Sequence, residues 1–475
     1  MKSKLVTLCI CAGLALPGVA AANSLLEIYQ EALSRDATLA SAEHARDAAV
    51  EARPQAWAAL LPHVTFSGNE QRQVSKFFST TSRFLLGGFT TYATNRGYTA
   101  SLTQQIWSFQ DFWQLKESAV QVASAENTYE NAAQSLVLRV AQAYFNVLAA
   151  QDTVRADVAA RDAFASQLEQ AKKQFSVGLS AITDVQTAQA SYDTSVATLI
   201  KDRQALANQR QALAVITGNY RAQIAPLADD IPLAPPDPPN ADQWVAAAEK
   251  DNLDLRAAQL NYDIAERDVS VQRSARLPSL QLQSSVGRSI SGGQSGANVR
   301  QWAAGVVLDF PVFQGGLVTS NVRRAVATAA QRQSDLTGQK RTVEQQTRDA
   351  YEGVMSGIAS VRAFKQAVNS NRTALKAAEV GLQVGTRNVV DVLTAQQNLN
   401  TALKNYYQSR YDYLISVLTL EQQAGRLTRN DLAAIDAMLA NTVGTPPPPE
   451  IPTTPQTNLP QPAAAGTSPP SSQAG

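Results

Sequence analysis

Two copies of one motif determine the architecture of this 475-residue chain: Phe175-Ser-Val-Gly-Leu-Ser-Ala-Ile-Thr-Asp184 and Leu382-Gln-Val-Gly-Thr-Arg-Asn-Val-Val-Asp391. Asp184 and Asp391 are 207 positions apart. Each copy has a single glycine within a long helical sequence, followed by β-branched residues and an aspartate that can cap a new helix. Each copy therefore predicts the turn of a long helical hairpin.

The rest of the chain repeats with nearly the same spacing, and small changes in that spacing correspond to loops of different length. Equivalent positions are Leu61-Pro62 and Leu277-Pro278, Ala143-Tyr144 and Ala350-Tyr351, and Gly218 and Gly425. We interpret the chain as a tandem duplication of a helix, strand, strand, helix, helix unit. The repeats cover residues 23–225 and 241–436, and a Pro-rich linker joins them at 226–240.

Both ends of the chain differ in composition from the repeats. Lys2 and Lys4, an apolar run over 5–16 and small residues up to Ala22 predict a signal peptide at 1–22, cleaved near Asn23. The apolar run is too short to favour a spanning helix. Residues 445–475 are rich in Pro, Thr, Ser, Gln and Ala, which predicts a disordered tail, with a polyproline ligand as the alternative.

Composition argues against several classes of function. The formal net charge of +1 provides no bulk attraction for nucleic acid. Cys9 and Cys11 both lie in the signal peptide, and neither His44 nor His63 has nearby residues that would complete a metal site. Because the sequence also lacks a nucleophile motif and a phosphate-binding loop, we expect no enzyme, no cofactor and no metal.

Long helices dominate each repeat. Residues 24–55 are Ala-rich and predict a helix that Pro54 and Leu61-Pro62 end, and the same pattern recurs over 241–276. Residues 111–177 contain neither Gly nor Pro. A helix of this length would span about 100 Å, whereas a globular helix has about 11 residues. Apolar or small residues recur in steps of four and three, which is typical of a coiled-coil seam; examples are Leu136, Val140, Ala143, Val147, Ala150 and Val154.

Each repeat also contains two segments in which apolar and polar residues alternate, as in a strand with two different faces. The strands are predicted at about 62–72 and 98–107, and at about 279–288 and 301–311. Aromatic residues such as Trp107, Phe109 and Phe313 lie at their ends. A half-buried strand in a soluble sheet is the alternative, but with a secretory signal the pattern favours strands that face lipid on one side and water on the other.

One chain supplies only four strands, and a sheet in lipid must close because an open edge leaves backbone groups unpaired. Several chains must therefore share one barrel. Two chains would give eight strands, whose interior is largely filled by side chains, whereas three would give twelve and leave room for a channel. The long helices would then form a bundle or tube on one side of the membrane, so the geometry suggests an oligomeric conduit.

These motifs resemble those of the TolC family of outer-membrane channels. The resemblance covers residues 23 to about 436 and rests on the duplicated Val-Gly-x-x-x-x-x-Asp-Val turn at 177–185 and 384–392, and on Phe-Pro-x-Phe-x-Gly-Gly at 310–316. It implies a mainly α homotrimer in which a 12-stranded transmembrane β-barrel continues into a long periplasmic α-helical barrel. It also implies an exit duct for efflux or type I secretion that binds a periplasmic adaptor and an inner-membrane efflux or ABC transporter.

The resemblance also implies roles for residues at the hairpin turns, which constrict the tube in this family. By position, Arg387 would bond to Asp184 and Thr183, with Gln167 nearby, and hold the tube shut. The alternative is a solvated ion pair worth less than about 1 kcal/mol. Asp391 matches an acidic ring at the entrance, with a helix N-cap as the alternative. The turns that match the adaptor-docking site, or else are merely tight turns, contain Val177, Gly178, Leu179, Ser180, Val384, Gly385, Thr386 and Arg387.

Two positions depart from the family pattern. Leu382 replaces a tyrosine that adds a second hydrogen bond to the gate, so we expect fewer links in the closed state. Thr394 replaces a second acidic residue of the entrance, so we expect weaker cation binding there. The alternative function is a periplasmic or surface coiled-coil protein, either structural or an adaptor. An adaptor would have a lipoyl-like β domain between its hairpin arms, which this sequence lacks.

Overall fold

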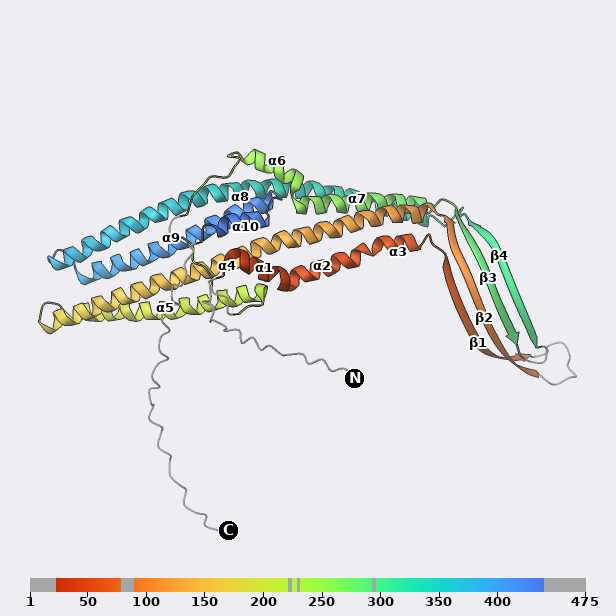
Figure 1. The fold of residues 1–475 in the computed structure, drawn as a ribbon, viewed down its shortest axis with the longest axis horizontal. Helices are drawn as coiled ribbons and strands as arrows, with labels where there is room; N and C mark the ends of the chain where they lie inside the picture. The colour runs from red at the N-terminus through yellow and green to blue at the C-terminus, as the bar shows by residue number, and fades with distance from the viewer. Residues whose placement is uncertain (1–22, 78–88, 221–223, 229–230, 293–295, 440–475) are drawn as a thin grey trace, which may run out of the picture.

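The computed structural model describes residues 23–77, 89–220, 224–228, 231–292 and 296–439. The predicted signal peptide and Pro-rich tail lie outside the described residues. The molecule is elongated, with a sheet at one end and the turns of two helical hairpins at the other (Figure 1). The elements are α1 (Leu25–Arg35), α2 (Ala37–Val50), α3 (Ala52–Ala58), β1 (His63–Phe77), β2 (Phe89–Trp107), α4 (Phe109–Ser176), α5 (Ile182–Thr217), α6 (Ala241–Asp251), α7 (Leu253–Ser274), β3 (Ser279–Ser291), β4 (Ala297–Asp309), α8 (Leu317–Gln383), α9 (Val389–Gln423) and α10 (Arg429–Asp436).

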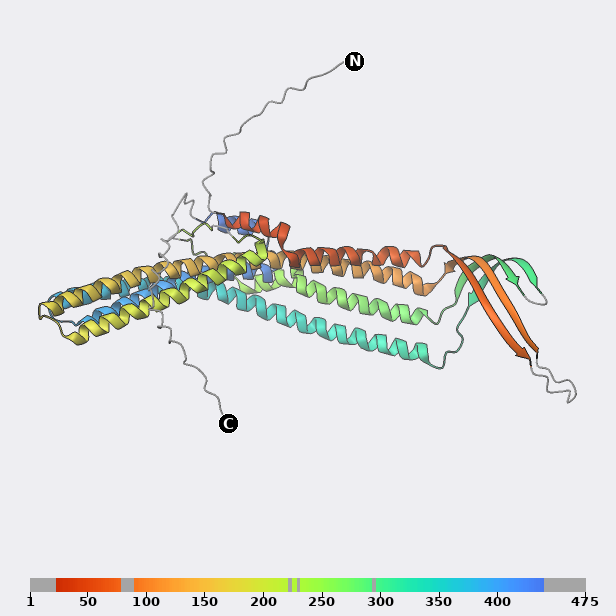
Figure 2. The same cartoon turned by 90° about the horizontal axis from the view of Figure 1, so that it is seen from below.

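Four lines of helix run along the long axis (Figures 1 and 2). Two are single helices, α4 with 68 residues and α8 with 67, each about 100 Å long at 1.5 Å per residue. The other two lines each combine a helix near the sheet with one near the turns: α2 and α3 with α5, and α7 with α9. Accordingly, α4 contacts α2, α3 and α7 near the sheet, and α5 and α9 near the turns.

The seam predicted for α4 forms the centre of the core. Leu136, Val140, Val147 and Val154 are all buried there, together with Tyr144. They pack against α9, which contributes buried residues from the second repeat. The two hairpins of the duplication are thus joined along the faces that the sequence periodicity identified.

The shorter helices break at equivalent points of the two repeats. Asp36 ends α1 and caps α2 by accepting a hydrogen bond from the Leu39 amide at 2.7 Å. Asn252 ends α6 and caps α7, accepting from the Leu255 amide at 3.0 Å. The prediction of one helix over 24–55 ended by Pro54 was therefore wrong. A new helix begins after Glu51, and Pro54 lies in its first turn, where a missing N–H costs no intrahelical hydrogen bond.

The four strands form one antiparallel sheet in the order β1-β2-β3-β4. Both hairpins are longer than the alternation predicted, since β2 already begins at Phe89 and β1 continues to Phe77. β-Branched residues such as Thr90, Thr91 and Thr94 extend the ladder of β2 without an apolar alternation.

The two faces of the sheet differ in polarity. The strand register brings the polar residues Thr65, Ser101 and Ser285 onto one face, together with Ala303. The opposite face is apolar and exposed; it contains Val64, Phe66, Ala100, Leu102, Leu280, Leu282, Val286, Trp302, Ala304, Val306 and Leu308. Phe66 is 74% exposed and Trp302 is 75% exposed. An apolar surface of this extent marks a site of contact with lipid or protein.

No helix in the described part of the chain combines the length and apolar character needed to cross a bilayer.

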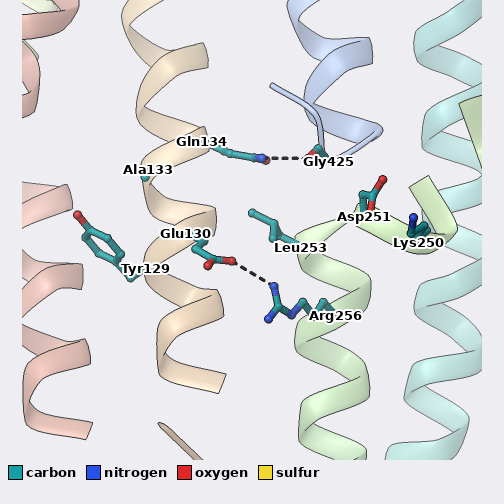
Figure 3. A pocket seen from close by; sticks show the side chains of 9 residues that line it. All are labelled: Tyr129, Glu130, Ala133, Gln134, Lys250, Asp251, Leu253, Arg256 and Gly425. Carbon is teal, nitrogen blue, oxygen red and sulfur yellow. Dashed lines mark hydrogen bonds and ion pairs between the residues drawn. The ribbon is translucent and has the colours of Figure 1, made fainter. Parts of the chain in front are cut away.

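The stacked helix lines require close backbone contact where α9 meets the break between α6 and α7. Gly425 has a φ of 72°, and a Cβ atom there would lie 2.1 Å from the carbonyl oxygen of Asp251. The side-chain amide of Gln134 donates to the carbonyl of Gly425 at 3.2 Å (Figure 3). Asn252 Nδ2 donates to the carbonyl of Gln423 at 2.8 Å. Glycine is therefore the residue that fits this junction.

We predict that Gly425→Ala lowers the free energy of unfolding by about 2 kcal/mol or more, because it adds backbone strain to a steric clash. The change is measured by denaturant unfolding followed by circular dichroism at 222 nm. Gly353→Ala is the matched control, since a Cβ atom at Gly353 meets nothing within 4 Å and that glycine lies within α8. The control should be neutral or stabilising by up to about 1 kcal/mol. Equal effects of the two substitutions would contradict this interpretation of the junction.

Candidate functional site at the helical turns

The two turns have the same backbone structure. Gly178 and Gly385 both have a φ of 76°. After α4, the Leu179 amide donates to Gln174 O at 2.8 Å and the Gly178 amide to Phe175 O at 3.0 Å. After α8, the Thr386 and Gly385 amides donate to Gly381 O and Leu382 O at 2.9 and 3.3 Å. Both helices therefore end in a Schellman motif with glycine in the left-handed position.

The residue two positions after each glycine contacts the aspartate four positions further on. In the first turn, the Ser180 hydroxyl donates to Asp184 Oδ2 at 2.6 Å. In the second, Arg387 Nη1 lies 3.8 Å from Asp391 Oδ2. Ser180 and Arg387 are themselves 207 positions apart. Equivalent positions thus make a hydroxyl–carboxylate hydrogen bond in the first turn and an ion pair in the second.

The interpretation of these aspartates as N-caps was wrong in detail. The N-cap of α9 is Asn388, which accepts from the Asp391 amide at 2.8 Å, while Asp391 accepts from the Asn388 amide at 3.3 Å. This is a capping box in which Asp391 is the third helical residue. Asp184 has the same position in α5, whose N-cap residue, Ala181, makes no side-chain hydrogen bond. Both carboxylates still favour helix formation, since they lie in a first turn.

The predicted gate residues lie at one end of the molecule, but the described part of this single chain contains no hydrogen bond or ion pair that joins Arg387 to Asp184, Thr183 or Gln167. Gln167 is half-buried on α4, and Thr183 is exposed in the first turn of α5. The Arg387 side chain is 61% exposed. Each charged residue thus has a local partner while remaining accessible to a second molecule.

Gly381 is a feature of the second turn that the sequence analysis missed. Its carbonyl accepts from the Thr386 and Arg387 amides and from Thr386 Oγ1, at 2.9, 3.1 and 3.2 Å. A Cβ atom at Gly381 would lie 2.6 Å from Arg387 Cγ. The aliphatic part of Arg387 therefore packs directly on the backbone of α8, which positions the guanidinium group.

The predicted docking turns expose apolar side chains. Leu179 is 80% exposed, Val384 is 69% exposed and Val177 is 67% exposed. Leu382, in contrast, is partly buried and packs against two small cores, one between the two hairpins and one between α8 and α9 of its own hairpin. One of these cores contains Phe164 and Leu393. Leu382 thus contributes apolar packing at the end of α8.

A buried charge cluster joins three helices further from the turns. Lys404 Nζ on α9 lies 2.6 Å from Asp157 Oδ1 on α4 and 2.8 Å from Asp202 Oδ2 on α5. Asn400 Nδ2 also donates to Asp157 Oδ1 at 3.1 Å. The Asp157 side chain is only 2% exposed. One charged residue on each of three distant helix segments gives no local sequence pattern, so sequence analysis could not identify this cluster.

The two carboxylates share one lysine, and their proton affinities diverge. Burial, together with the neighbouring Asp202, raises the pKa of Asp157. Burial also acts to raise the pKa of Asp202, but hydrogen bonds with Asp157 and Lys404 outweigh it and lower that pKa. Burial opposes the charge on Lys404, yet the two carboxylates raise its pKa above the usual value. Lys404 is therefore held as a cation between them.

Among the described residues, no group of three or more His, Cys, Asp or Glu side chains could hold a metal ion.

Comparison with known proteins identifies the family. The model of the family described as "Outer membrane efflux protein" matches residues 28–219 and 244–426, which cover most of both repeats. The chain belongs to this family. The resemblance to TolC-like channels seen in the sequence is thereby confirmed, and the mainly α fold with an internal repeat agrees with it.

Individual relatives support this family assignment. Outer membrane protein TolC of Escherichia coli is 34% identical over 471 residues, which cover 94% of this chain and 92% of the relative. Alkaline protease secretion protein AprF of Pseudomonas aeruginosa is 29% identical over 88% of this chain and 87% of its own. The crystal structure of the Campylobacter jejuni CmeC outer membrane channel has a similar fold, with a TM-score of 0.71 at 19% identity over 88% of this chain and 90% of that one.

The protein described by this sequence is an outer-membrane exit duct of the kind used in efflux and secretion, and its helices extend into the periplasm. The family and these relatives are transport proteins, and their partners belong to efflux or secretion systems.

We predict that Lys404→Met lowers the free energy of unfolding by about 3 kcal/mol at pH 7, because it leaves the buried Asp157 and the half-buried Asp202 without their cation. The loss should be smaller near pH 4. Without the lysine, the pKa values of the carboxyls in the folded state rise above their unfolded values. The variant is therefore most stable at pH values below the carboxyl pKa of the unfolded chain. Its stability falls as pH rises through the carboxyl pKa values of the folded state. Denaturant unfolding at both pH values measures this difference.

Lys376→Met is the control, since Lys376 is an exposed lysine on α8. Its effect should stay within about 0.5 kcal/mol at both pH values. The same loss for Lys404→Met at pH 4 and pH 7 would show that the cluster acts by packing and not by charge.

Proposed function

We propose that three copies of this chain form a passive duct in which a 12-stranded β-barrel crosses the outer membrane and a helical tube crosses the periplasm. The observation that carries this proposal is the sheet. Among the described strands, β1 and β4 each have a neighbour on one side only, and the apolar face of the sheet is exposed. A sheet of this kind is stable in lipid only when copies pair β4 of one chain with β1 of the next.

The number of copies follows from the requirement that the interior of the barrel conduct. The polar face, with residues such as Thr65, Ser101 and Gln283, must line that interior if the apolar face contacts lipid. Eight strands from two copies would fill the interior with side chains, whereas twelve from three copies leave an aqueous lumen. A trimer is therefore the smallest assembly that both closes the sheet and conducts.

The helices of three copies would form a closed tube, as their strands form a closed barrel. One chain forms an arc of four helix lines, with α8 at one border and the line of α5 at the other (Figure 1). Three arcs then surround a lumen continuous with that of the barrel, and six turns form its periplasmic end. Three copies of Asp391 would make a cation-favouring ring there, and Thr394 adds no charge to it.

The gate would involve an exchange of partners at these turns. Arg387 contacts Asp391 within its own hairpin at 3.8 Å, and Asp184 accepts from Ser180 within its own hairpin at 2.6 Å. In the closed trimer, Arg387 would instead bond to Asp184 and Thr183 of another hairpin, with Gln167 nearby. Exposed ion pairs are weak, so local and inter-hairpin partners of Arg387 differ little in free energy and the gate can open without unfolding a helix.

The exposed apolar turns provide the docking surface for a periplasmic adaptor, which connects the duct to an inner-membrane efflux or ABC transporter. Leu179 and Val384 are the most exposed large apolar side chains of their turns. The turns that contain them lie at the end of the molecule furthest from the sheet (Figure 1), so in the proposed assembly they would lie closest to the inner membrane. Apolar side chains exposed on an otherwise polar tip favour contact with another protein.

We predict that the purified mature protein has three times the mass of one chain and gives small, steady, cation-preferring current steps in a planar bilayer. Arg387→Ser should raise the single-channel conductance several-fold, because it removes the link that holds the turns together. Asp184→Asn should do the same to a smaller extent, since an amide still accepts one hydrogen bond.

Arg372→Ser is the matched control, since it removes an exposed arginine of α8 at some distance from the turn. Its conductance should equal that of the wild type. If Arg387→Ser leaves the conductance unchanged, Arg387 does not hold the gate closed, whereas the proposal that the protein forms a channel still stands. Folded protein that never inserts would refute the barrel.

We predict that Leu179→Asp abolishes export in cells while leaving the bilayer conductance unchanged, because a buried carboxylate is unfavourable at an apolar docking surface. Export is measured as accumulation of a fluorescent dye and as secreted protein in the medium, at equal amounts of channel. Val215→Asp, at an exposed position near the other end of α5, should export normally. Normal export by Leu179→Asp would place docking elsewhere.

A further inference from the structure

All charged side chains in the outer half of the sheet lie on one face. The register pairs Glu70 with Arg96, and Arg288 with both Tyr98 and Arg300. This face is the continuation of the apolar face that contains Val64 and Phe66. Its charged residues are Glu70, Arg72, Lys76, Arg96, Arg288 and Arg300, and all six are exposed. The opposite face of the same strand segments has uncharged residues, among them Asn69, Gln71, Gln73 and Asn95.

The charges on this face are strongly unbalanced. Glu70 is its one acidic residue within the described strands, and it already binds Arg96 at 3.2 Å. The sequence contains no Asp or Glu over 71–110 or over 269–308, segments that include both hairpin loops. Pairing of neighbouring chains therefore cannot neutralise the excess, since each copy contributes five basic residues and one acidic residue.

Two arginines even lie directly opposite each other. Arg288 and Arg300 are register partners on β3 and β4. Arg288 Nε donates to Asn298 Oδ1 at 2.9 Å, which satisfies a hydrogen bond but does not neutralise charge. Like charges directly opposite one another on a sheet are destabilising. Such an arrangement is favoured when an external anion binds between the two side chains.

The position of these residues relative to the apolar band indicates where the anion lies. Residues 280–286 of β3 span about 20 Å along the strand at roughly 3.3 Å per residue, which covers part of the apolar band of about 25 Å found on outer-membrane barrels. Arg288 is the next residue on the same face. Tyr98 lies beside it and is 53% exposed, as expected for an aromatic residue at the edge of the hydrocarbon. Because the helices lie on the periplasmic side, this edge is the external one.

We propose that Arg72, Lys76, Arg96, Arg288 and Arg300, here called the basic collar, bind the phosphate groups of phosphorylated glycolipid headgroups in the outer leaflet of the membrane. The proposal rests on the proposed assembly, in which the apolar face is turned outward. Guanidinium groups bind phosphate through paired hydrogen bonds. A lipid is the source of the phosphate, because a ligand of the collar lies directly above the apolar band, where acyl chains contact the protein.

The test compares binding of lipid A, a phosphorylated glucosamine disaccharide lipid, with binding of the same lipid after enzymatic removal of its phosphates. Each lipid is added to the detergent-solubilised full protein, and bound lipid is counted by native mass spectrometry. We expect wild-type protein to bind lipid A at least tenfold more tightly than the dephosphorylated lipid. Arg288→Gln combined with Arg300→Gln should remove most of this preference, and Arg288→Lys combined with Arg300→Lys should retain part of it.

Arg323→Gln combined with Arg324→Gln is the matched control, since it removes two exposed arginines from α8 near the periplasmic end of the sheet. This variant should bind lipid A as the wild type does. If the two glutamine variants lose lipid A binding equally, binding depends on the overall charge of the protein and not on the collar, and the proposal is wrong. Displacement of lipid A by millimolar inorganic phosphate would overturn the assignment to a lipid.

Conductance separates this proposal from the proposed function. The glutamine variant of the collar should still form channels of wild-type conductance. Channels that show no preference for lipid A would refute the collar alone. Folded wild-type protein that forms no channel would refute the proposed assembly on which the collar rests.

Discussion

Backbone hydrogen bonding at the two edges of the sheet is the constraint on which the rest of the molecule depends. β1 and β4 each present a row of N–H and C=O groups that one chain cannot satisfy, and hydrocarbon offers no water in place of a partner. In the proposed assembly, closing the sheet with further copies would arrange the helices around the same axis. The length of α4 and α8 then determines how far every turn lies from the membrane, so the strand edges control the geometry of a site about 100 Å away.

Duplication provides two hairpins of equal length, and divergence makes their turns chemically different. The backbone is conserved between the repeats, since Gly178 and Gly385 have the same φ and the same hydrogen-bonding pattern. The side chains two residues later differ: Ser180 is neutral, whereas Arg387 is cationic. In the proposed trimer, alternating turns with Ser180 and Arg387 would place each arginine beside an aspartate of a different hairpin. Two identical arginine turns would instead repel one another.

Much of the fold follows from short-range sequence signals. Glycine at the turns, the absence of Gly and Pro from α4 and the four-three spacing of Leu136, Val140 and Val147 are sufficient to predict the hairpins and their seam. The break at Asp36 was missed because an aspartate within an Ala-rich segment is compatible with a continuous helix until its tertiary partner is known. That partner is Arg139 on α4, which binds Asp36 through two hydrogen bonds of 3.0 and 3.2 Å.

The site was less predictable than the fold, for the same physical reason. The turn residues could be matched one by one, but the position of Arg387 depends on contact with Gly381 across a helix end, and single residues of α4, α5 and α9 meet only after the hairpins have packed. Alternation along each strand predicted its two faces. The charge imbalance of the outer sheet becomes visible only when the register places residues from β1, β2, β3 and β4 on one surface.

The buried charge cluster addresses a weakness of this architecture. A seam rich in alanine allows close approach of helices, but small side chains interlock weakly and specify one register poorly. A slip of one helix turn is about 5.4 Å, enough to move Arg387 away from any partner on another hairpin. Lys404 can satisfy both Asp157 and Asp202 in one alignment of α4, α5 and α9, and any slip would leave charges buried and unpaired. The cluster thus favours a single register of α4, α5 and α9. The proposed gate would depend on that register, because exposed ion pairs at the turns are too weak to impose it themselves.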